Sequence, residues 1–272
     1  MPIIKEISCR SILNPSNLGG EVKYSVNPYV GCQHGCLYCY AVFMRRHTGH
    51  REEWGDFVDA KVNAPTLLAK EASRRQRGLV FISSVTDAYQ PAERRYELTR
   101  RCLEQLLKYR YPIEILTKSA LVTRDADLFA KSPGCRVGFT IAMIDENARR
   151  EFEPNSSSID ERFAALEELH IRGIETWIFL GPILPRVTDS GDGLEELVRR
   201  AARAGTELIM IDRLNMKPDM TPRFMKFIRE KRPDLLSEYE KILFSRDNYF
   251  QDRKSRIIKI CGEMGVKAES CF

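Results

Sequence analysis

The chain has 272 residues, of which 43% are hydrophobic and 30% are charged, with a formal net charge of +5. This composition supports a sizeable core and excludes disorder over most of the chain. No apolar run approaches the roughly 18 residues that a membrane span needs, and no signal peptide is visible, so we expect a cytoplasmic protein without a membrane partner.

Short β-rich runs alternate with helical patterns along the first 218 residues. The β-rich runs end in glycine, proline or polar residues, and the helical runs place apolar residues at spacings of three and four. The predicted strands are 24–30, 78–83, 112–117, 135–142, 174–180 and 207–212, and the clearest predicted helices are 95–109, 159–171 and 194–204.

This alternation predicts an α/β fold in which a parallel sheet is covered by helices. Six strand–helix units are too few for an eight-stranded barrel, so we expect a partial (β/α)6 barrel of the TIM type. Residues 219–272 do not continue the alternation, because prolines interrupt a helical and basic sequence. We therefore predict a partial barrel over 1–218 and a helical, basic C-terminal extension over 219–272.

Three of the eight cysteines, Cys32, Cys36 and Cys39, lie in one segment at C-x3-C-x2-C spacing. Without an export signal the default compartment is reducing, where clustered thiols are metal ligands or catalytic groups before they are disulfides. Three thiolates can hold three irons of a 4Fe–4S cubane and leave the fourth iron without a protein ligand. Gly31 and Gly35 favour a loop over 31–41.

Two other interpretations of these thiols stay open. Spacings of four and three also place three residues on one face of a helix, so the cysteines could belong to the core. They could also hold the metal centre of a non-enzymatic iron–sulfur or zinc protein, and for zinc His34 or His47 would complete a tetrahedral site.

The cysteine motif, with an aromatic residue before its last cysteine, resembles that of the radical S-adenosyl-L-methionine (SAM) superfamily. The resemblance implies an enzyme whose 4Fe–4S cluster cleaves SAM reductively, giving a 5′-deoxyadenosyl radical that abstracts hydrogen from a substrate. It also implies a reductant of the flavodoxin or ferredoxin kind. Further segments resemble the spore photolyase-like branch, within about residues 24–185: 27–41, 86–93, 116–119 with Arg124-Asp125, and 153–154 followed by Arg162.

Carried over residue by residue, this resemblance places Tyr38 and Tyr40 beside the cofactor. Thr86 and Asp87, which follow the second strand, would contact the methionine moiety, and Asp87 would accept a hydrogen bond from its ammonium. Ordinary core packing is the alternative for the two tyrosines, and a turn-forming aspartate is the alternative for Asp87.

The next two strands supply two further candidates. Lys118, directly after the third strand, would pair with the SAM carboxylate, and Thr140, on the fourth, would touch the ribose. The alternatives are an exposed lysine and a threonine that merely favours β structure. Glu153 and Arg162 could form an ion pair near the cofactor, but we treat them as a weak surface pair.

The substrate is not specified by these motifs. Segment 221–260 has eleven Lys and Arg against six Asp and Glu, so it carries the whole net charge and makes a nucleic-acid partner one option. A solvated helical surface is the alternative for this segment, and a peptide or small molecule is the alternative substrate. Ser84 stands where spore photolyase has a hydrogen-donating cysteine, so we expect no efficient repair of the spore photoproduct.

Overall fold

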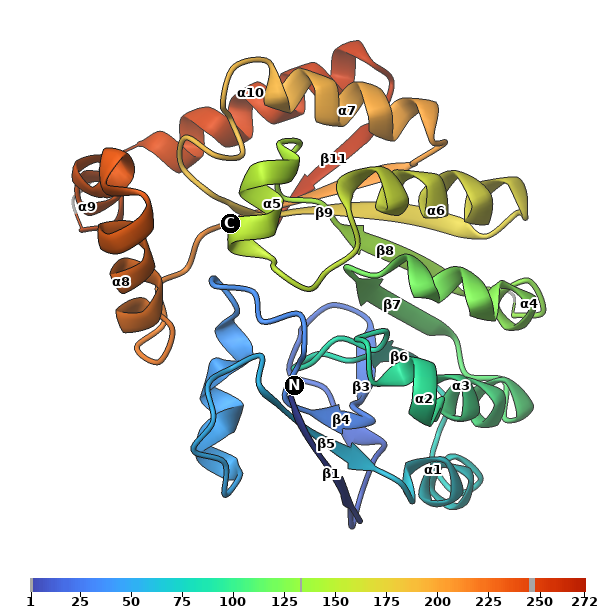
Figure 1. Cartoon of the computed structure of the whole chain (residues 1–272). Helices are drawn as coiled ribbons and strands as arrows, with labels where there is room; N and C mark the ends of the chain where they lie inside the picture. Colours follow the sequence, from blue (N-terminus) through green and yellow to red (C-terminus); the bar gives the residue numbers. More distant parts are fainter. Residues whose placement is uncertain (1, 133, 245–247) are drawn as a thin grey trace.

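The computed structural model describes residues 2–132, 134–244 and 248–272, which form a curved, mostly parallel sheet covered by helices (Figure 1). Within these residues the main sheet has eight strands in the order β11-β10-β9-β8-β7-β6-β3-β2, and only β2 (Asn14–Pro15) pairs in antiparallel fashion. This confirms the predicted α/β partial barrel. The six strands that carry it are β3 (Val22–Val26), β6 (Leu79–Ile82), β7 (Ile113–Thr117), β8 (Arg136–Thr140), β9 (Glu175–Ile183) and β10 (Leu208–Arg213).

The first predicted strand, 24–30, is wrong in its extent. It divides into β3 and β4 (Tyr29–Val30), and β4 belongs to a separate small sheet with β5 (Phe57–Lys61) and β1 (Ile3–Ile7). Pro28 stands between the two pieces and has no N–H for a ladder hydrogen bond. The break sends the chain into the loop that carries the three cysteines.

Helices between the strands pack on the outer, convex face of the sheet (Figure 1). The predicted helix 95–109 is two helices, because Glu97 adopts a left-handed backbone conformation with φ 48° between them. The buried carboxylate of Glu93 accepts the N–H groups of Thr99 and Arg100 at 2.9 and 3.2 Å, which begins the second helix. The outer helices are α1 (Ala64–Ala72), α2 (Glu93–Tyr96), α3 (Leu98–Lys108), α4 (Ala126–Phe129), α6 (Ile159–Ile171), α7 (Gly193–Arg203) and α10 (Tyr249–Glu263).

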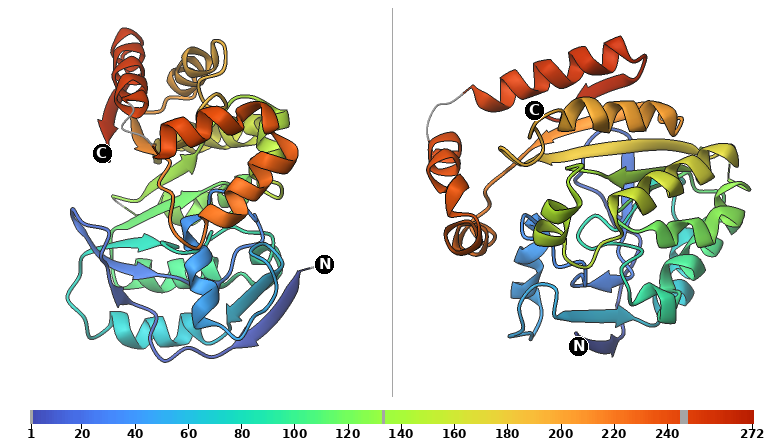
Figure 2. Two further views of the ribbon diagram at one scale, coloured as in Figure 1. Left: turned by 90° about the vertical axis from the view of Figure 1, so that its left-hand side faces the viewer. Right: turned by 45° about the horizontal axis from the view of Figure 1, so that its top comes forward.

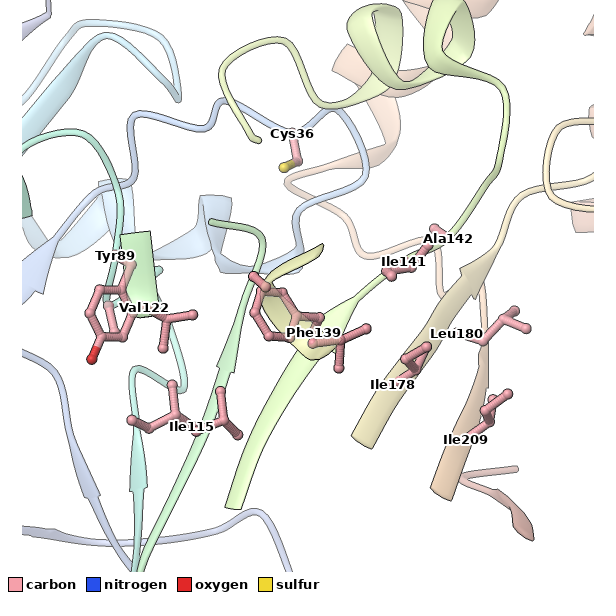
Figure 3. Packing of buried hydrophobic residues seen from close by; sticks show 14 of the residues in the cluster. Cys36, Tyr89, Ile115, Val122, Phe139, Ile141, Ala142, Ile178, Leu180 and Ile209 are labelled. Atoms are coloured by element: carbon pink, nitrogen blue, oxygen red, sulfur yellow. The ribbon is translucent and has the colours of Figure 1, made fainter. Parts of the chain in front are cut away.

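Side chains alternate along each strand, so that one set packs in an apolar layer under the helices and the other set faces the interior of the barrel. Ile115, Phe139, Ile178 and Ile209 are buried in the layer beneath the helices, where Figure 3 shows them in a row across four strands. The residues between them line the inside of the barrel. Positions after the carboxyl ends of the strands therefore meet at one rim of that interior.

The C-terminal part holds α8 (Thr221–Lys231), α9 (Leu236–Phe244), α10 and a final strand, β11 (Lys267–Ser270). The expectation of a purely helical extension missed β11, which pairs in parallel with β10 and extends the main sheet. Its four residues, Lys-Ala-Glu-Ser, are too short and too polar to give a strand pattern. Figure 2 shows α8 and α9 beside the barrel and α10 against its outer side. The boundary at residue 218 stays a prediction.

Candidate functional site

The cysteine segment is a loop, as its glycines predict, followed by the 3-10 helix η1 (Tyr40–His47). Gly31 and Gly35 have φ values of +82° and +64°, in the left-handed region that suits glycine. A Cβ on Gly31 would lie 2.5 Å from the carbonyl oxygen of Phe57 on β5. Strand β5 of the small sheet thus packs directly against the loop at Gly31, where only a residue without a side chain fits.

The segment after β6 holds the loop from one side. Thr86 donates its hydroxyl to the carbonyl oxygen of Gly31 at 2.6 Å and accepts from the amide of Gln90 at 3.0 Å. Gln90, which is fully buried, also accepts the backbone N–H of Gln33 at 2.9 Å. Thr86 therefore positions the loop that carries the cysteines.

The segment between α5 (Glu146–Phe152) and α6 holds the loop from the opposite side. The phenol of Tyr38 donates to Glu153, and Glu153 forms an ion pair with Arg162 of α6, with both charged side chains fully buried. Arg162 also donates to the carbonyl oxygens of Thr140 and Ser157 at 2.9 and 3.0 Å. Burial would raise the pKa of Glu153, but Arg162 and Lys118 outweigh it, and the pKa lies below its ordinary value.

The thiols of Cys32, Cys36 and Cys39 form no disulfides and open into one cavity of about 780 Å³ inside the barrel. Figure 3 shows Cys36 above the apolar layer of the strands. Burial raises the pKa of Cys36 to about 12. Lys118 opposes this shift, whereas the negative charges of Glu153 and Cys39 add to it. Burial also raises the pKa of the other two thiols. Three close, unpaired thiols on one cavity wall suit a cofactor that takes three thiolates.

Asp87 lines this cavity, but its carboxylate is already engaged. One oxygen accepts from the Thr117 hydroxyl at 2.7 Å and the Tyr89 N–H at 2.9 Å. The other accepts the Lys118 N–H at 2.9 Å and lies 3.3 Å from Nδ1 of His34. Burial would raise the pKa of Asp87, but His34, Thr117 and Lys118 outweigh this and lower it well below its usual range.

Lys118 and Thr140 line the same cavity from β7 and β8. The Lys118 ammonium lies 5.6 Å from the centre of the Tyr38 ring and donates no hydrogen bond within the described part of the chain. Burial would lower the pKa of Lys118, but the negative charge of Cys36, Glu153 and Asp87 outweighs it and raises the pKa. This ammonium is therefore a cation held ready beside the thiols for an anionic group.

The structure separates the two tyrosines. Tyr40 is half exposed, lines the cavity and donates its hydroxyl to the Ser84 carbonyl oxygen. Tyr38 is buried, is not among the residues that line the cavity, and is turned toward Glu153. Ser84 lines the cavity, and its hydroxyl accepts from the Asn27 amide at 3.1 Å.

The histidines of the zinc interpretation do not join the thiols in a single-ion site. His34 lines the cavity near Asp87, whereas His47 is exposed and is not part of its wall. Among the described residues, no group of three or more His, Cys, Asp or Glu side chains is arranged to hold one metal ion. Thiols that bind separate irons of a cubane stand farther apart than thiols that share one ion.

Sequence reasoning missed two contributions to the site. Glu153 and Arg162 are a buried pair, not a surface pair, and Arg162 falls three residues after Ile159 and four before Leu166, on the buried face of α6. That spacing was the available signal. Arg223 of α8 donates to the carbonyl oxygens of Gly35 and Cys36 at 2.9 and 3.3 Å, and no sequence signal marked it.

The structure is thus a partial parallel barrel in which the loop after β4 carries three free thiols. A family model described as the radical SAM superfamily matches residues 26–201. The chain therefore belongs to the radical SAM superfamily and is an enzyme of that class. Radical SAM enzymes use a 4Fe–4S cluster with SAM and need a reductant.

Comparisons with individual proteins show relatives over most of the chain and a shared fold. An uncharacterized protein of Methanocaldococcus jannaschii is 35% identical over 231 residues, covering 85% of this chain and 84% of that protein. A protein of Pseudomonas phage M6 named radical SAM Nalpha-GlyT isomerase is 24% identical over 187 residues, covering 68% of this chain and 38% of that protein. The fold is similar to spore photoproduct lyase with AdoMet and a dinucleoside spore photoproduct bound, at a TM-score of 0.74 and 15% identity, covering 99% and 82% of the two chains.

Among the residues that the structure describes, no helix combines the length and the apolar character that crossing a bilayer requires.

Proposed function

We propose that this protein cleaves SAM reductively, with Cys32, Cys36 and Cys39 as the ligands of its 4Fe–4S cluster. One observation carries the proposal: three unpaired thiols of a single loop open, together with Lys118, into one cavity at the carboxyl end of the barrel strands. When bound, the cluster and SAM supply a 5′-deoxyadenosyl radical that removes a hydrogen atom from a substrate. The three thiols would hold three irons of the cluster, which would leave the fourth iron free to bind SAM.

The remaining cavity residues divide into contacts and supports. Lys118 pairs with the SAM carboxylate, since its ammonium has no competing hydrogen bond among the described residues, and Thr140 lies next to the ribose. Tyr40, on the cavity wall, lies beside the cofactor. Asp87 holds the backbone of Lys118, because its oxygens already accept three hydrogen bonds and one of them also lies 3.3 Å from Nδ1 of His34. A hydrogen bond from the SAM ammonium would share an oxygen with one of these partners.

The substrate shares the cavity with SAM. About 780 Å³ lies within the range of single small-molecule sites, so the reacting group is limited to about the size of one nucleoside or a short peptide side chain. Glu21, Asp212 and Glu269 also line the cavity. These carboxylates repel phosphate, which favours a neutral or cationic reacting group from a small molecule or a peptide.

A nucleic acid is the second candidate, and the dinucleoside spore photoproduct bound in the spore photoproduct lyase structure, whose fold is similar, supports it. Its predicted contact through segment 221–260 has lost support, because most cations there are engaged, and Arg246 lies outside the described residues. A solvated, ion-paired surface explains this segment better. The engaged cations are Lys226 with Glu230, Arg232 with Asp234, Arg253 with Asp189, Arg256 with Glu195, Lys259 with Glu263, and Lys254 with the Phe272 carbonyl oxygen.

Anaerobic reconstitution followed by a SAM cleavage assay tests the main proposal. The wild type should bind about four irons and four sulfides per chain and should release 5′-deoxyadenosine under dithionite. Cys32→Ala, Cys36→Ala and Cys39→Ala should each abolish this release, whereas Cys102→Ala, in the buried face of α3, should keep it. Cleavage by the triple variant would contradict the assignment.

Adding candidate substrates to the same assay separates the two classes. A peptide or amine library, single-stranded DNA and RNA should be compared for faster formation of 5′-deoxyadenosine and for deuterium transfer into it. We expect stimulation by a small molecule or peptide. Stimulation by nucleic acid alone, falling steeply with added salt, would favour the second candidate.

We further propose that the spore photoproduct is not the substrate. The Ser84 hydroxyl holds its hydrogen too strongly to give it to a carbon radical, as a thiol can. The reduced enzyme, incubated with a dinucleotide spore photoproduct, should therefore not release thymine in step with SAM turnover. Clean conversion at the turnover rate would contradict this.

A further inference from the structure

The N-terminal turn of α8 reaches the cysteine loop through one side chain. Arg223 is the third residue of α8, and its guanidinium donates to the carbonyl oxygen of Gly35 at 2.9 Å and to that of Cys36 at 3.3 Å. These two carbonyls belong to an irregular loop that has no strand partner at this point. The contact joins the C-terminal part of the chain to the peptide between the first and third cysteines.

The geometry of the contact suits arginine. Buried backbone carbonyls need a donor, and a planar guanidinium can serve two successive carbonyls with its separate N–H groups. Gly35 is buried and adopts a positive φ, so the chain turns at this residue and presents both oxygens on one side. A lysine would supply the charge but only a point donor, and an amide would supply donors without the charge.

The charge of Arg223 is not paired with a carboxylate at salt-bridge distance in the described part of the chain. Arg232, on the same part of the chain, by contrast pairs with Asp234 at 3.0 Å. Burial lowers the pKa of Arg223, and the thiols of Cys39 and Cys36, followed by the carboxylates of Glu53 and Asp56, oppose this change. The guanidinium is thus close enough to these thiols for their charges to interact.

We propose that Arg223 is a positioning residue for the cluster loop and that its charge makes the bound cluster easier to reduce. The inference rests on the proposed function. Reduction adds one electron, and so one negative charge, to a centre that already carries three thiolates. A nearby cation that is partly buried stabilises the more negative state, and net charge and hydrogen bonds near the sulfurs set the potentials of such clusters.

The test compares Arg223→Gln and Arg223→Lys with the wild type in reconstituted enzyme. Arg229→Gln is the matched control, because Arg229 is an exposed arginine of the same helix that forms no salt bridge or hydrogen bond among the described residues. A redox titration followed by electron paramagnetic resonance should give a more negative midpoint potential for Arg223→Gln. The midpoint potential of Arg223→Lys should lie closer to that of the wild type, and the potential of Arg229→Gln should equal the wild-type value. A wild-type potential in Arg223→Gln would overturn the inference.

A second measurement reports the positioning role without the cluster. Hydrogen exchange in the metal-free chain should be faster at residues 33–39 in Arg223→Gln than in the wild type, and unchanged in Arg229→Gln. Unchanged exchange in Arg223→Gln would overturn the positioning role even if that variant assembled no cluster. A wild type that binds no cluster would instead contradict the proposed function, so the two failures are distinguishable.

Discussion

The buried pair of Glu153 and Arg162 should be one of the strongest determinants of stability in the chain. Replacing Arg162 by methionine removes the partner of a fully buried carboxylate, and also the donors to the carbonyl oxygens of Thr140 and Ser157. Breaking a buried pair on one side costs roughly 3–5 kcal/mol. That is a large fraction of the 5–15 kcal/mol by which domains are usually stable.

The same helix offers a matched control. Arg172 and Glu168 form an exposed i,i+4 pair at 2.8 Å on α6. Exposed pairs contribute about 0–1 kcal/mol, so Arg172→Met should change the free energy of unfolding by less than about 1 kcal/mol. Because the pKa of Glu153 is lowered in the folded state, its contribution is complete at neutral pH and is lost as pH falls through the folded pKa. Urea unfolding of the metal-free protein at pH 7 therefore measures the whole pair.

The double variant Glu153→Leu/Arg162→Met completes the cycle. Removing both charges leaves no uncompensated ion in the core, so this variant should be more stable than Arg162→Met alone. The cycle also needs the single variant Glu153→Leu. The reasoning about this pair is refuted if Arg162→Met lowers the free energy of unfolding no more than Arg172→Met does. It is also refuted if the losses of Arg162→Met and Glu153→Leu add up to the loss of the double variant. Iron content should fall together with stability, because Glu153 anchors Tyr38, the residue before Cys39.

Three further outcomes follow from the site. Lys118→Met should keep the iron content but weaken SAM binding about ten- to a hundredfold, as loss of a charged hydrogen bond does; unchanged affinity in calorimetry would remove Lys118 from the SAM site. Gly31→Ala should lower both stability and iron content, whereas Gly19→Ala, with a similar φ of +79° but open space around it, should cost only about 1–2 kcal/mol in thermal unfolding. Asp87→Asn should reduce SAM binding and should also speed hydrogen exchange in the cysteine loop. Reduced SAM binding with unchanged exchange would instead indicate that Asp87 contacts SAM directly.

The sequence was most informative where local chemistry repeats. Alternating apolar runs predicted the barrel strands, and the paired glycines indicated a loop around the thiols. The resemblance to the radical SAM superfamily suggested Lys118 and Thr140 as cofactor contacts, and both line the cavity into which the thiols open. The strands and the loop could be predicted because they depend only on neighbours along the chain.

Long-range partners could not be found in the same way. Asp87 lines the cavity, yet its distant partners come from two other points of the chain, residues 117–118 and His34, so the sequence suggested a free carboxylate where the structure has an occupied one. Glu153 and Arg162 looked like a surface pair because burial is a tertiary property. Breaking a Glu–Arg pair destabilises a protein little at the surface and strongly in the core. Only the position of Arg162 on the apolar face of α6 indicated that this pair is buried.

The contacts across residue 218 bear on how this enzyme is built. β11 adds a parallel strand to β10, so the last part of the chain completes the wall of the barrel instead of resting on it. Glu269 and Cys271, two residues apart as alternation requires, both face the cavity. Arg223 meanwhile reaches the cluster loop at the other end of the same segment. Because this segment supplies both a wall of the cavity and a support for the cysteine loop, a change in it can affect both.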